Sequence, residues 1–251
     1  MWRNYLTVGI RALAKNKTYA FINIFGLAIG MAACLMILLY VRYEMSYDKW
    51  IPDADRIYQV QSWYKSTETG EETFLQMTPY ASGAAIQKDF PQVESQVYLF
   101  NNNPVFLKDG EATSSEDFLF TDGNFLATVP LPLKRGEPDA LGQVNTVVLT
   151  ESEARKQFGT DDVVGQTLTM ITRGITRDFR ITGILEDLPK NTHFKTTGIA
   201  RLDYAGYNFD TPDVLTCWGC QNGHIYLKLK PGADSQAIEA GFPAWEKRNI
   251  P

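Results

Sequence analysis

Several residues and motifs that enzyme chemistry needs are scarce in this sequence or missing from it. Only two histidines occur, His193 and His224. No lysine follows the G-x-x-x-x-G spacing of a Walker A phosphate-binding loop, and no G-x-S-x-G nucleophile elbow is present. ATP hydrolysis by the Walker route is therefore excluded, and a serine triad would lack its usual context. We expect a protein without enzyme activity and without a cofactor.

Acidic residues are absent before Glu44, whereas five of the 24 Lys and Arg residues lie there. The remaining 19 basic residues face 29 acidic ones, so the chain beyond this point carries a net charge of about -10. An acidic domain repels phosphate backbones, and no basic stripe with interleaved aromatic residues occurs to overcome that repulsion. We therefore expect no nucleic-acid partner.

A long apolar run without charge lies near the N-terminus. Residues 19–41 (YAFINIFGLAIGMAACLMILLYV) contain no charged side chain. At about 1.5 Å per residue they would form about 35 Å of helix, which is enough to cross a bilayer core. The eleven Leu, Ile, Phe and Val residues of the run together favour insertion by roughly 3 to 7 kcal/mol. The sequence therefore predicts a transmembrane helix at residues 19–43, with the lipid bilayer as its partner.

Cleavage of this run as a signal is the main alternative. Met31-Ala32-Ala33-Cys34 is close to a lipoprotein cleavage box, and basic residues before an apolar run also describe a secretory signal. However, seven apolar residues, Leu35 to Val41, follow this box, and no small-residue cleavage site comes after them. A span that stays in the chain is favoured. A buried core helix of a soluble protein would need only about half this length.

The residues before the span predict its orientation. An apolar face that includes Trp2 and Ile10 opposes a polar and basic face, which predicts a short interfacial helix at residues 1–18. Four basic residues precede the span and three follow soon after it. This difference favours a cytoplasmic N-terminus and places residues 44–251 on the other side of the membrane.

Small residues form a stripe within the predicted span. Gly26 and Gly30 are four residues apart, and Ala33 lies about one turn further on. Small side chains let two membrane helices approach closely, so these three residues are a candidate helix-packing face.

Beyond residue 44, strand and helix signals alternate and predict an α+β domain. Thr150 with Glu153 forms a capping box that Gly159 closes. We expect this mixed α/β domain to have two lobes, with a β-rich inserted lobe at roughly residues 95–195. The expected strands are 56–64, 93–100, 145–149, 166–172, 177–185 and 224–230, and the expected helices are 80–90, 150–159 and a last one from Asp234 that Pro243 should kink or end.

Cys217-Trp218-Gly219-Cys220 is the motif of most chemical interest. C-x-x-C with an intervening Trp is typical of thioredoxin-like sites, but those open a helix, whereas this motif precedes a strand. A zinc site made of the two cysteines, His224 and His193 lacks a second C-x-x-C or a clear fourth ligand. Three interpretations remain: a local disulfide between Cys217 and Cys220, inert thiols, or metal or redox work. The disulfide is favoured, and no catalytic, cofactor-binding or metal-binding residue is assigned.

Six segments occur in the order found in one protein family. They are FINIFGLAIGMAACLMILLYVRYEMSYDKW at 21–50, RIYQV at 56–60, the Pro79 helix leading to DFPQVE at 89–94, VVLTESEARKQFGTDDVVGQTL at 147–168, GILEDLPKNTHF at 183–194 and IYLKLKPGAD at 225–234. Through these segments the chain resembles the periplasmic core domain of ABC-transporter permeases of the MacB/FtsX type, especially those of Bacteroidetes-like bacteria. The resemblance covers nearly the whole chain.

The resemblance implies a non-catalytic permease subunit in the bacterial inner membrane, with its main domain in the periplasm. A separate cytoplasmic ABC ATPase would drive it, and the domain would couple ATP hydrolysis to export or to other work in the cell envelope. One span cannot line a pathway. Further membrane helices are therefore expected, from a longer native gene, a partner chain or a second permease copy.

Physical reasoning alone also supports a single-span protein that displays a sensing or binding domain. The sequence identifies no substrate for either interpretation.

Overall fold

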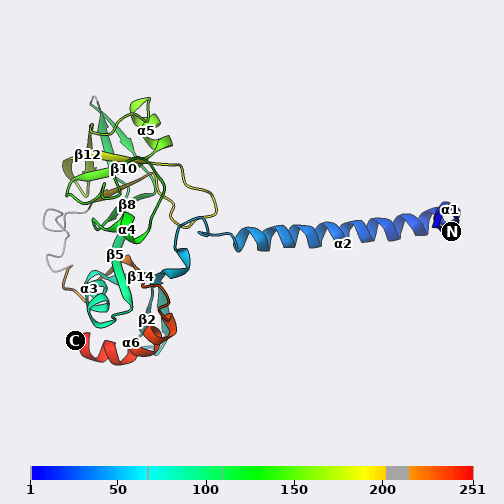
Figure 1. The fold of residues 1–251 in the computed structure, drawn as a ribbon, viewed down its shortest axis with the longest axis horizontal. Helices are drawn as coiled ribbons and strands as arrows, with labels where there is room; N and C mark the ends of the chain where they lie inside the picture. The colour runs from blue at the N-terminus through cyan, green and yellow to red at the C-terminus, as the bar shows by residue number, and fades with distance from the viewer. Residues whose placement is uncertain (1, 67, 109, 202–214, 251) are drawn as a thin grey trace. The chain divides into compact units, whose positions relative to one another are not determined.

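The computed structural model describes residues 2–66, 68–108, 110–201 and 215–250. It divides into two compact units, Met1–Tyr47 and Asp48–Pro251, which are called unit 1 and unit 2 below. Figure 1 shows the helices and strands of both units.

Unit 1 is helical. Helix α1 (Trp2–Lys15) and helix α2 (Lys17–Glu44) are separated by Asn16. The 28 residues of α2 include a window of mean hydropathy 2.5, and the helix is long and apolar enough to cross a membrane by length and composition. Its large apolar side chains, from Phe21 to Val41, are exposed.

Unit 2 contains the remaining elements, which follow one another along residues 54–249. The strands are β1 (Ile57–Val60), β2 (Ser62–Lys65), β3 (Glu72–Leu75), β4 (Thr78–Pro79), β5 (Val93–Asn101), β6 (Val105–Lys108), β7 (Glu111–Ser114), β8 (Phe118–Thr121), β9 (Leu133–Gly136), β10 (Thr146–Thr150), β11 (Thr167–Thr172), β12 (Ile175–Leu185), β13 (Gly198–Arg201) and β14 (Gln221–Leu229). The helices are the 3-10 turn η1 (Ala54–Arg56), α3 (Tyr80–Asp89), α4 (Phe125–Thr128), α5 (Glu151–Phe158) and α6 (Ser235–Asn249).

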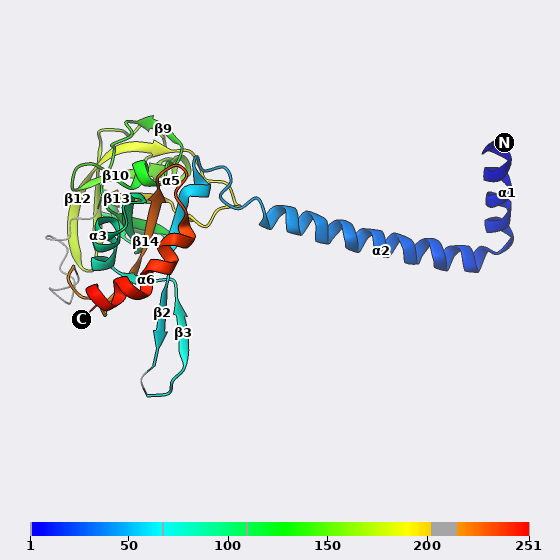
Figure 2. The same ribbon diagram turned by 60° about the horizontal axis from the view of Figure 1, so that its bottom comes forward.

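One mixed sheet of twelve strands organises unit 2, which confirms the expected mixed α/β class. The strand order is β1-β14-β5-β8-β13-β10-β12-β11-β6-β7, with β4 paired to β14 and β9 paired to β12. The pairs β10–β12 and β8–β13 are parallel, and the other described pairs are antiparallel. Strands β2 and β3 form a separate two-stranded hairpin. Figure 2 shows this hairpin projecting from the rest of the domain.

Both faces of the large sheet are buried, because two hydrophobic clusters lie on opposite sides of it. Along β8, Phe118 and Phe120 belong to one cluster and Leu119 between them belongs to the other. Strand β10 alternates in the same way at Val147 and Val148. Continuous apolar runs of this kind are typical of strands that are covered on both faces. Residues of α3, α5 and α6 complete the first cluster, and residues of α4 complete the second.

Local sequence signals account for the best-predicted elements. The Thr150 side chain accepts a hydrogen bond from the Glu153 backbone N–H and caps α5, and Gly159 ends the helix with φ 75°. The hairpin β11–β12 turns through Arg173 and Gly174, both with positive φ, as a two-residue turn between twisted strands requires.

The reciprocal half of the expected capping box is wrong. The Thr150 N–H donates instead to the Thr197 carbonyl (3.0 Å), because Thr150 is still part of β10. The Glu153 carboxylate accepts from Gln157 Nε2 (2.8 Å).

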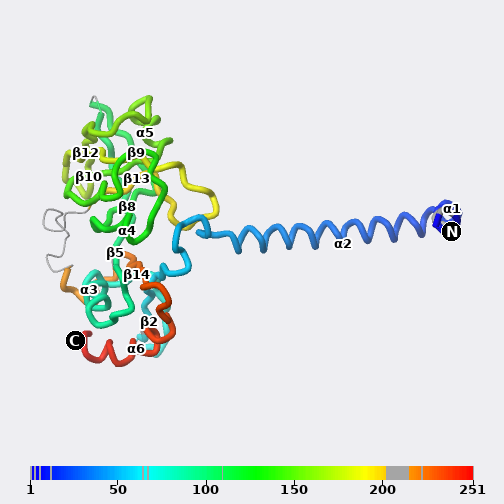
Figure 3. Tube along the Cα trace, viewed as in Figure 1, coloured from blue at the N-terminus to red at the C-terminus, as the bar shows by residue number. Residues whose placement is uncertain are grey.

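Two further expectations are corrected. The strand expected at 56–64 is two strands in different sheets, since β1 pairs with β14 whereas β2 pairs with β3. Pro243 does not end the last helix, which runs through it to Asn249. Figure 3 shows that α6 bends along its length, as expected where a proline removes a backbone donor.

Candidate functional site

The chain enters unit 2 through residues 48–56, called the entry segment below, and Asp48 fixes its start. Asp48 Oδ1 accepts hydrogen bonds from Thr192 Oγ1 (2.6 Å) and from the His193 backbone N–H (3.2 Å). Its other carboxylate oxygen pairs with His193 Nδ1. The Asp48 backbone N–H donates to the Asn191 carbonyl (3.0 Å). The entry segment is therefore tied to the loop at 191–193 by both side chain and backbone.

Aromatic packing supports this contact from beneath. The His193 ring stacks on Phe194 with 5.1 Å between centroids, and Phe194 lies 5.2 Å from the Tyr226 ring of β14. Burial raises the pKa of the Tyr226 hydroxyl, and the negative charge of Asp48 raises it further. Ile51 of the entry segment is buried in the same cluster. The contact therefore lies directly over buried core residues, although the His193 side chain itself is 54% exposed.

A second contact holds the far end of the entry segment. Arg56 Nη2 lies 2.6 Å from an Asp53 carboxylate oxygen, and Lys228 Nζ lies 3.2 Å from the same oxygen. The hydrogen bond from Lys228, followed by that from Arg56, lowers the pKa of Asp53. Arg56 also donates to Glu94 Oε2 (3.0 Å) and to the Leu229 carbonyl (2.9 Å). Strands β5 and β14 are thus joined to the entry segment through one guanidinium.

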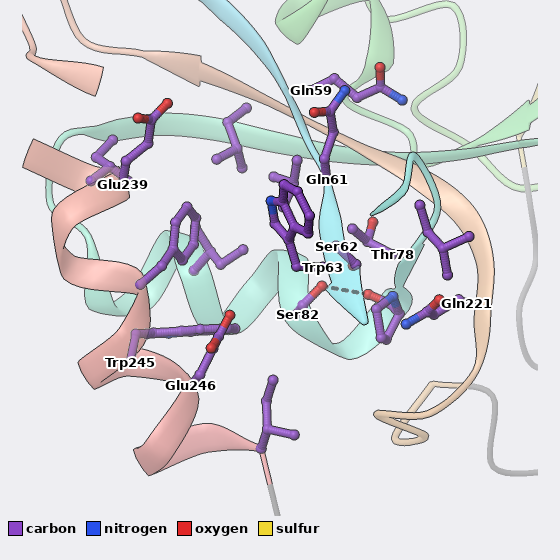
Figure 4. A pocket seen from close by; sticks show the side chains of 18 of the residues that line it. Gln59, Gln61, Ser62, Trp63, Thr78, Ser82, Gln221, Glu239, Trp245 and Glu246 are labelled. Atoms are coloured by element: carbon purple, nitrogen blue, oxygen red, sulfur yellow. Dashed lines mark hydrogen bonds between the residues drawn. The ribbon is translucent and has the colours of Figure 1, made fainter. Parts of the chain in front are cut away.

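A large groove opens on the other side of β14, between the β2–β3 hairpin and α6. Its volume is about 1330 Å³. Figure 4 shows Trp63 of β2 in the part of the groove framed by α3 with Ser82 and by α6 with Trp245 and Glu246. Ile86, Leu227 and Leu229 also line it. The groove is lined mainly by apolar and aromatic side chains, as ligand-binding grooves usually are.

The two walls of the groove differ in how tightly they are packed. On the hairpin wall, Trp63 and Phe74 contact each other edge to face at 5.4 Å and are 72% and 46% exposed. On the helical wall, Trp245 is buried and contacts Trp218 of the C-x-x-C loop at 5.8 Å. The hairpin wall therefore offers aromatic surface that nothing in the described chain covers fully.

Cys217 and Cys220 are bonded to each other, with 5.4 Å between their Cα atoms. The two histidines of the zinc interpretation are engaged elsewhere: His193 pairs with Asp48, and His224 Nδ1 lies 3.0 Å from Gln59 Nε2. Among the described residues no group of three or more His, Cys, Asp and Glu side chains is arranged to hold a metal ion. The structure thus does not bring the proposed zinc ligands together.

The small-residue stripe lies on α2. Apart from the adjoining backbone of α2 and the two neighbouring residues, a Cβ atom added at Gly26 or Gly30 would meet nothing within 4 Å. This face is open in the described chain, and its use for helix packing stays a prediction.

Sequence reasoning named neither the entry segment nor the groove as a site. The signals for the first were present, because Asp48 and His193 both lie in segments that carry the family resemblance. The groove joins residues 58–86 to residues 216–250, and no local pattern in either stretch reveals that they meet. The spacing of Ile238, Phe242 and Trp245 does indicate a helix with one apolar face.

The chain is similar in sequence and fold to known proteins. A domain assigned to a permease protein from Porphyromonas gingivalis is 25% identical, with a TM-score of 0.66, and the match covers 80% of this chain and 84% of that one. The periplasmic region of MacB from Actinobacillus actinomycetemcomitans is 15% identical, with a TM-score of 0.51 and coverage of 77% and 84%, and supports the fold alone. A comparison with curated protein sequences gave no match. Residues 20–244 match the family described as the MacB-like periplasmic core domain, and the chain belongs to that family.

Proposed function

We propose that the chain is the N-terminal part of a non-catalytic permease subunit of a MacB/FtsX-type ABC transporter. Helix α2 anchors it in the bacterial inner membrane, the N-terminus is cytoplasmic, and unit 2 works in the periplasm. A separate cytoplasmic ATPase supplies the energy. Family membership over residues 20–244 is the observation that carries this proposal.

The surface of α2 supports the membrane anchor. Side chains such as Phe25, Leu35 and Leu39 are more than half exposed, at 56%, 61% and 66%. Soluble monomers rarely expose a continuous apolar surface of this size, whereas a helix in lipid does so along its whole length. The same surface provides room for further permease helices or a second permease copy at Gly26 and Gly30.

The entry segment supports a coupling role. Only three residues, 45–47, lie between the end of α2 and Asp48. A connection of three residues has a short reach, so a displacement of the helix end beyond that reach would pull on the contacts at Asp48 and Arg56. We infer that ATP-driven movement of membrane helices reaches the large sheet through this segment and does export or envelope work there.

Co-purification tests the proposal. The native gene is expressed together with its neighbouring genes, and the tagged chain is purified from membranes in mild detergent. We expect a Walker-type ATPase to co-purify and its ATP hydrolysis to depend on the chain. The Asp48→Ala variant, at equal abundance, should keep the ATPase bound but abolish the transport-linked phenotype. Absence of any ATPase, with the chain intact in the membrane, would favour a single-span sensing or binding protein.

A further inference from the structure

The groove between the β2–β3 hairpin and α6 is negatively charged, although most of its lining is apolar. Among the described residues that line it, Glu239 and Glu246 are the charged ones, and no Lys, Arg or His is present. Neither carboxylate has an ion pair within the described chain. They are seven residues apart on α6, with Phe242 between them. Two turns of helix place them about 10 Å apart on one face.

Two polar side-chain atoms of residues that line the groove lack hydrogen-bond partners among the described residues. Thr78 is 1% exposed and Trp245 is 3% exposed. Both line the groove, and neither Thr78 Oγ1 nor Trp245 Nε1 has a hydrogen-bond partner in the described chain. Pro243 has no backbone N–H, so the carbonyl of Glu239 lacks its usual helical donor. Buried polar groups without partners are costly. Thr78 Oγ1 and Trp245 Nε1 each have less than 1 Å² of accessible surface, so a ligand would reach them only after the groove walls rearrange.

The size of the groove suits a large ligand. Small-molecule sites usually enclose about 300 to 1,000 Å³, whereas this groove has a volume of about 1330 Å³. A wide apolar groove beside a helix is the shape that accepts the apolar face of an amphipathic peptide helix. The exposed rings of Trp63 and Phe74 would add cation-π contacts to any ammonium or guanidinium group over them.

We propose that this groove binds a basic amphipathic peptide segment of a partner protein. The apolar face of the segment packs against Trp63, Phe74 and Phe242, and two Lys or Arg side chains about two turns apart pair with Glu239 and Glu246. Charge complementarity with an acidic domain selects this partner over an acidic one. The binding does not depend on an ATPase, so it stands or falls separately from the permease assignment.

A pair of synthetic helices tests the groove. The full chain is placed in nanodiscs of zwitterionic lipid, with empty nanodiscs as the reference for membrane binding. The probe is a labelled 15-residue peptide with Leu at helical spacing i, i+3, i+4 and i+7 and Lys elsewhere. The matched peptide carries Glu in place of every Lys. We expect saturable binding of the Lys peptide and at least tenfold weaker binding of the Glu peptide.

Variants locate the binding. Glu239→Gln with Glu246→Gln, and separately Trp63→Ala, should each weaken the Lys peptide at least tenfold. The matched control is Glu111→Gln with Glu186→Gln, two exposed carboxylates outside the groove, which should change the affinity less than twofold. The proposal would be overturned if the control variant lost as much affinity for the Lys peptide as the groove variants, or if the groove variants lost none. A tetraphenylphosphonium ion that binds with the same variant dependence while the Lys peptide does not would replace the peptide with a small cation.

Discussion

At the scale of single residues, Asp48 has a backbone conformation that few side chains tolerate. Its φ is 54°, in the left-handed region where Asp and Asn are the commonest residues after Gly. Its carboxylate also receives the hydrogen bonds from Thr192 and His193. Both the backbone conformation and the hydrogen bonds therefore favour Asp at this position. A control residue with the same φ but no such hydrogen bonds separates the two effects.

Replacing Asp48 should weaken unit 2 more than its backbone strain explains. Asp48→Ala removes charge-assisted hydrogen bonds worth about 2 kcal/mol, and it adds about 1 kcal/mol of strain because Ala tolerates the left-handed region less well than Asp. Asp117 has nearly the same φ, 53°, and is exposed, so Asp117→Ala should be destabilised by the added strain alone. Urea unfolding of the full chain in detergent measures both. An Asp48→Ala loss no larger than that of Asp117→Ala would show that the contact contributes nothing.

The cysteine pair should be structural. We expect Cys217→Ser with Cys220→Ser to lower the free energy of unfolding by about 2 kcal/mol, because the bond closes a loop of only a few residues. The Trp218 ring should also pack less firmly on Trp245. Added quenchers should therefore reduce the tryptophan fluorescence of the double variant more than that of the unmodified chain. Transport-linked phenotypes should persist. Complete loss of function in a folded and normally abundant double variant would mean that the thiols have redox work.

At the scale of elements, α5 is fastened to β9 by a cluster of charges. Lys134 Nζ lies 2.6 Å from Glu151 Oε1 and 3.0 Å from Asp161 Oδ2, and Arg155 Nη2 lies 3.0 Å from both acids. The Lys134 hydrogen bonds lower the pKa of Glu151 and of Asp161 below their ordinary values of 4.5 and 3.8. Below those values the folded state binds fewer protons than the unfolded state, so acid favours unfolding.

Removing the lysine should therefore change the pH dependence of stability. Lys134→Met should lower the urea midpoint at pH 7, where both carboxylates are charged. The difference in urea midpoint between this variant and the unmodified chain should narrow as the pH falls below about 4.5 and then through the lowered pKa values of Glu151 and Asp161. Lys65→Met breaks an exposed pair with Glu72 in the hairpin and should change little at any pH. A gap that stays constant from pH 7 to pH 3 would contradict the assignment.

The elements also show what the sequence could predict and what it could not. Helix α5 was predictable because Thr150 and Gly159 mark its ends through contacts made within a few residues. The division of 56–64 was not, because alternation predicts an extended chain but says nothing of which strand pairs with it. Only the register of β1 with β14 and of β2 with β3 reveals that the chain changes sheets near Gln61. The groove could not be predicted for the same reason, because its two walls come from distant parts of the sequence and meet only in the folded chain.

At the scale of the whole molecule, sequence and structure support one account from different directions. The sequence motifs predicted the family, and residues 20–244 match it. The predicted span corresponds to α2, a helix whose exposed apolar surface suits lipid. The boundary of the inserted lobe, the orientation of the span and the coupling to a separate ATPase stay predictions. Among these predictions, the orientation of the span matters most for the proposed function. Coupling by the entry segment requires unit 2 to lie on the side of the membrane opposite the ATPase.

Thiol labelling measures that orientation directly. In a Cys34→Ser background, spheroplasts are reduced and treated with a membrane-impermeant maleimide before and after lysis. The account predicts that Cys217 and Cys220 react in intact spheroplasts, whereas a cysteine introduced by Asn4→Cys in a chain lacking the other cysteines reacts only after lysis. Labelling of Cys217 and Cys220 only after lysis, with Asn4→Cys labelled in intact spheroplasts, would place unit 2 in the cytoplasm and contradict the account.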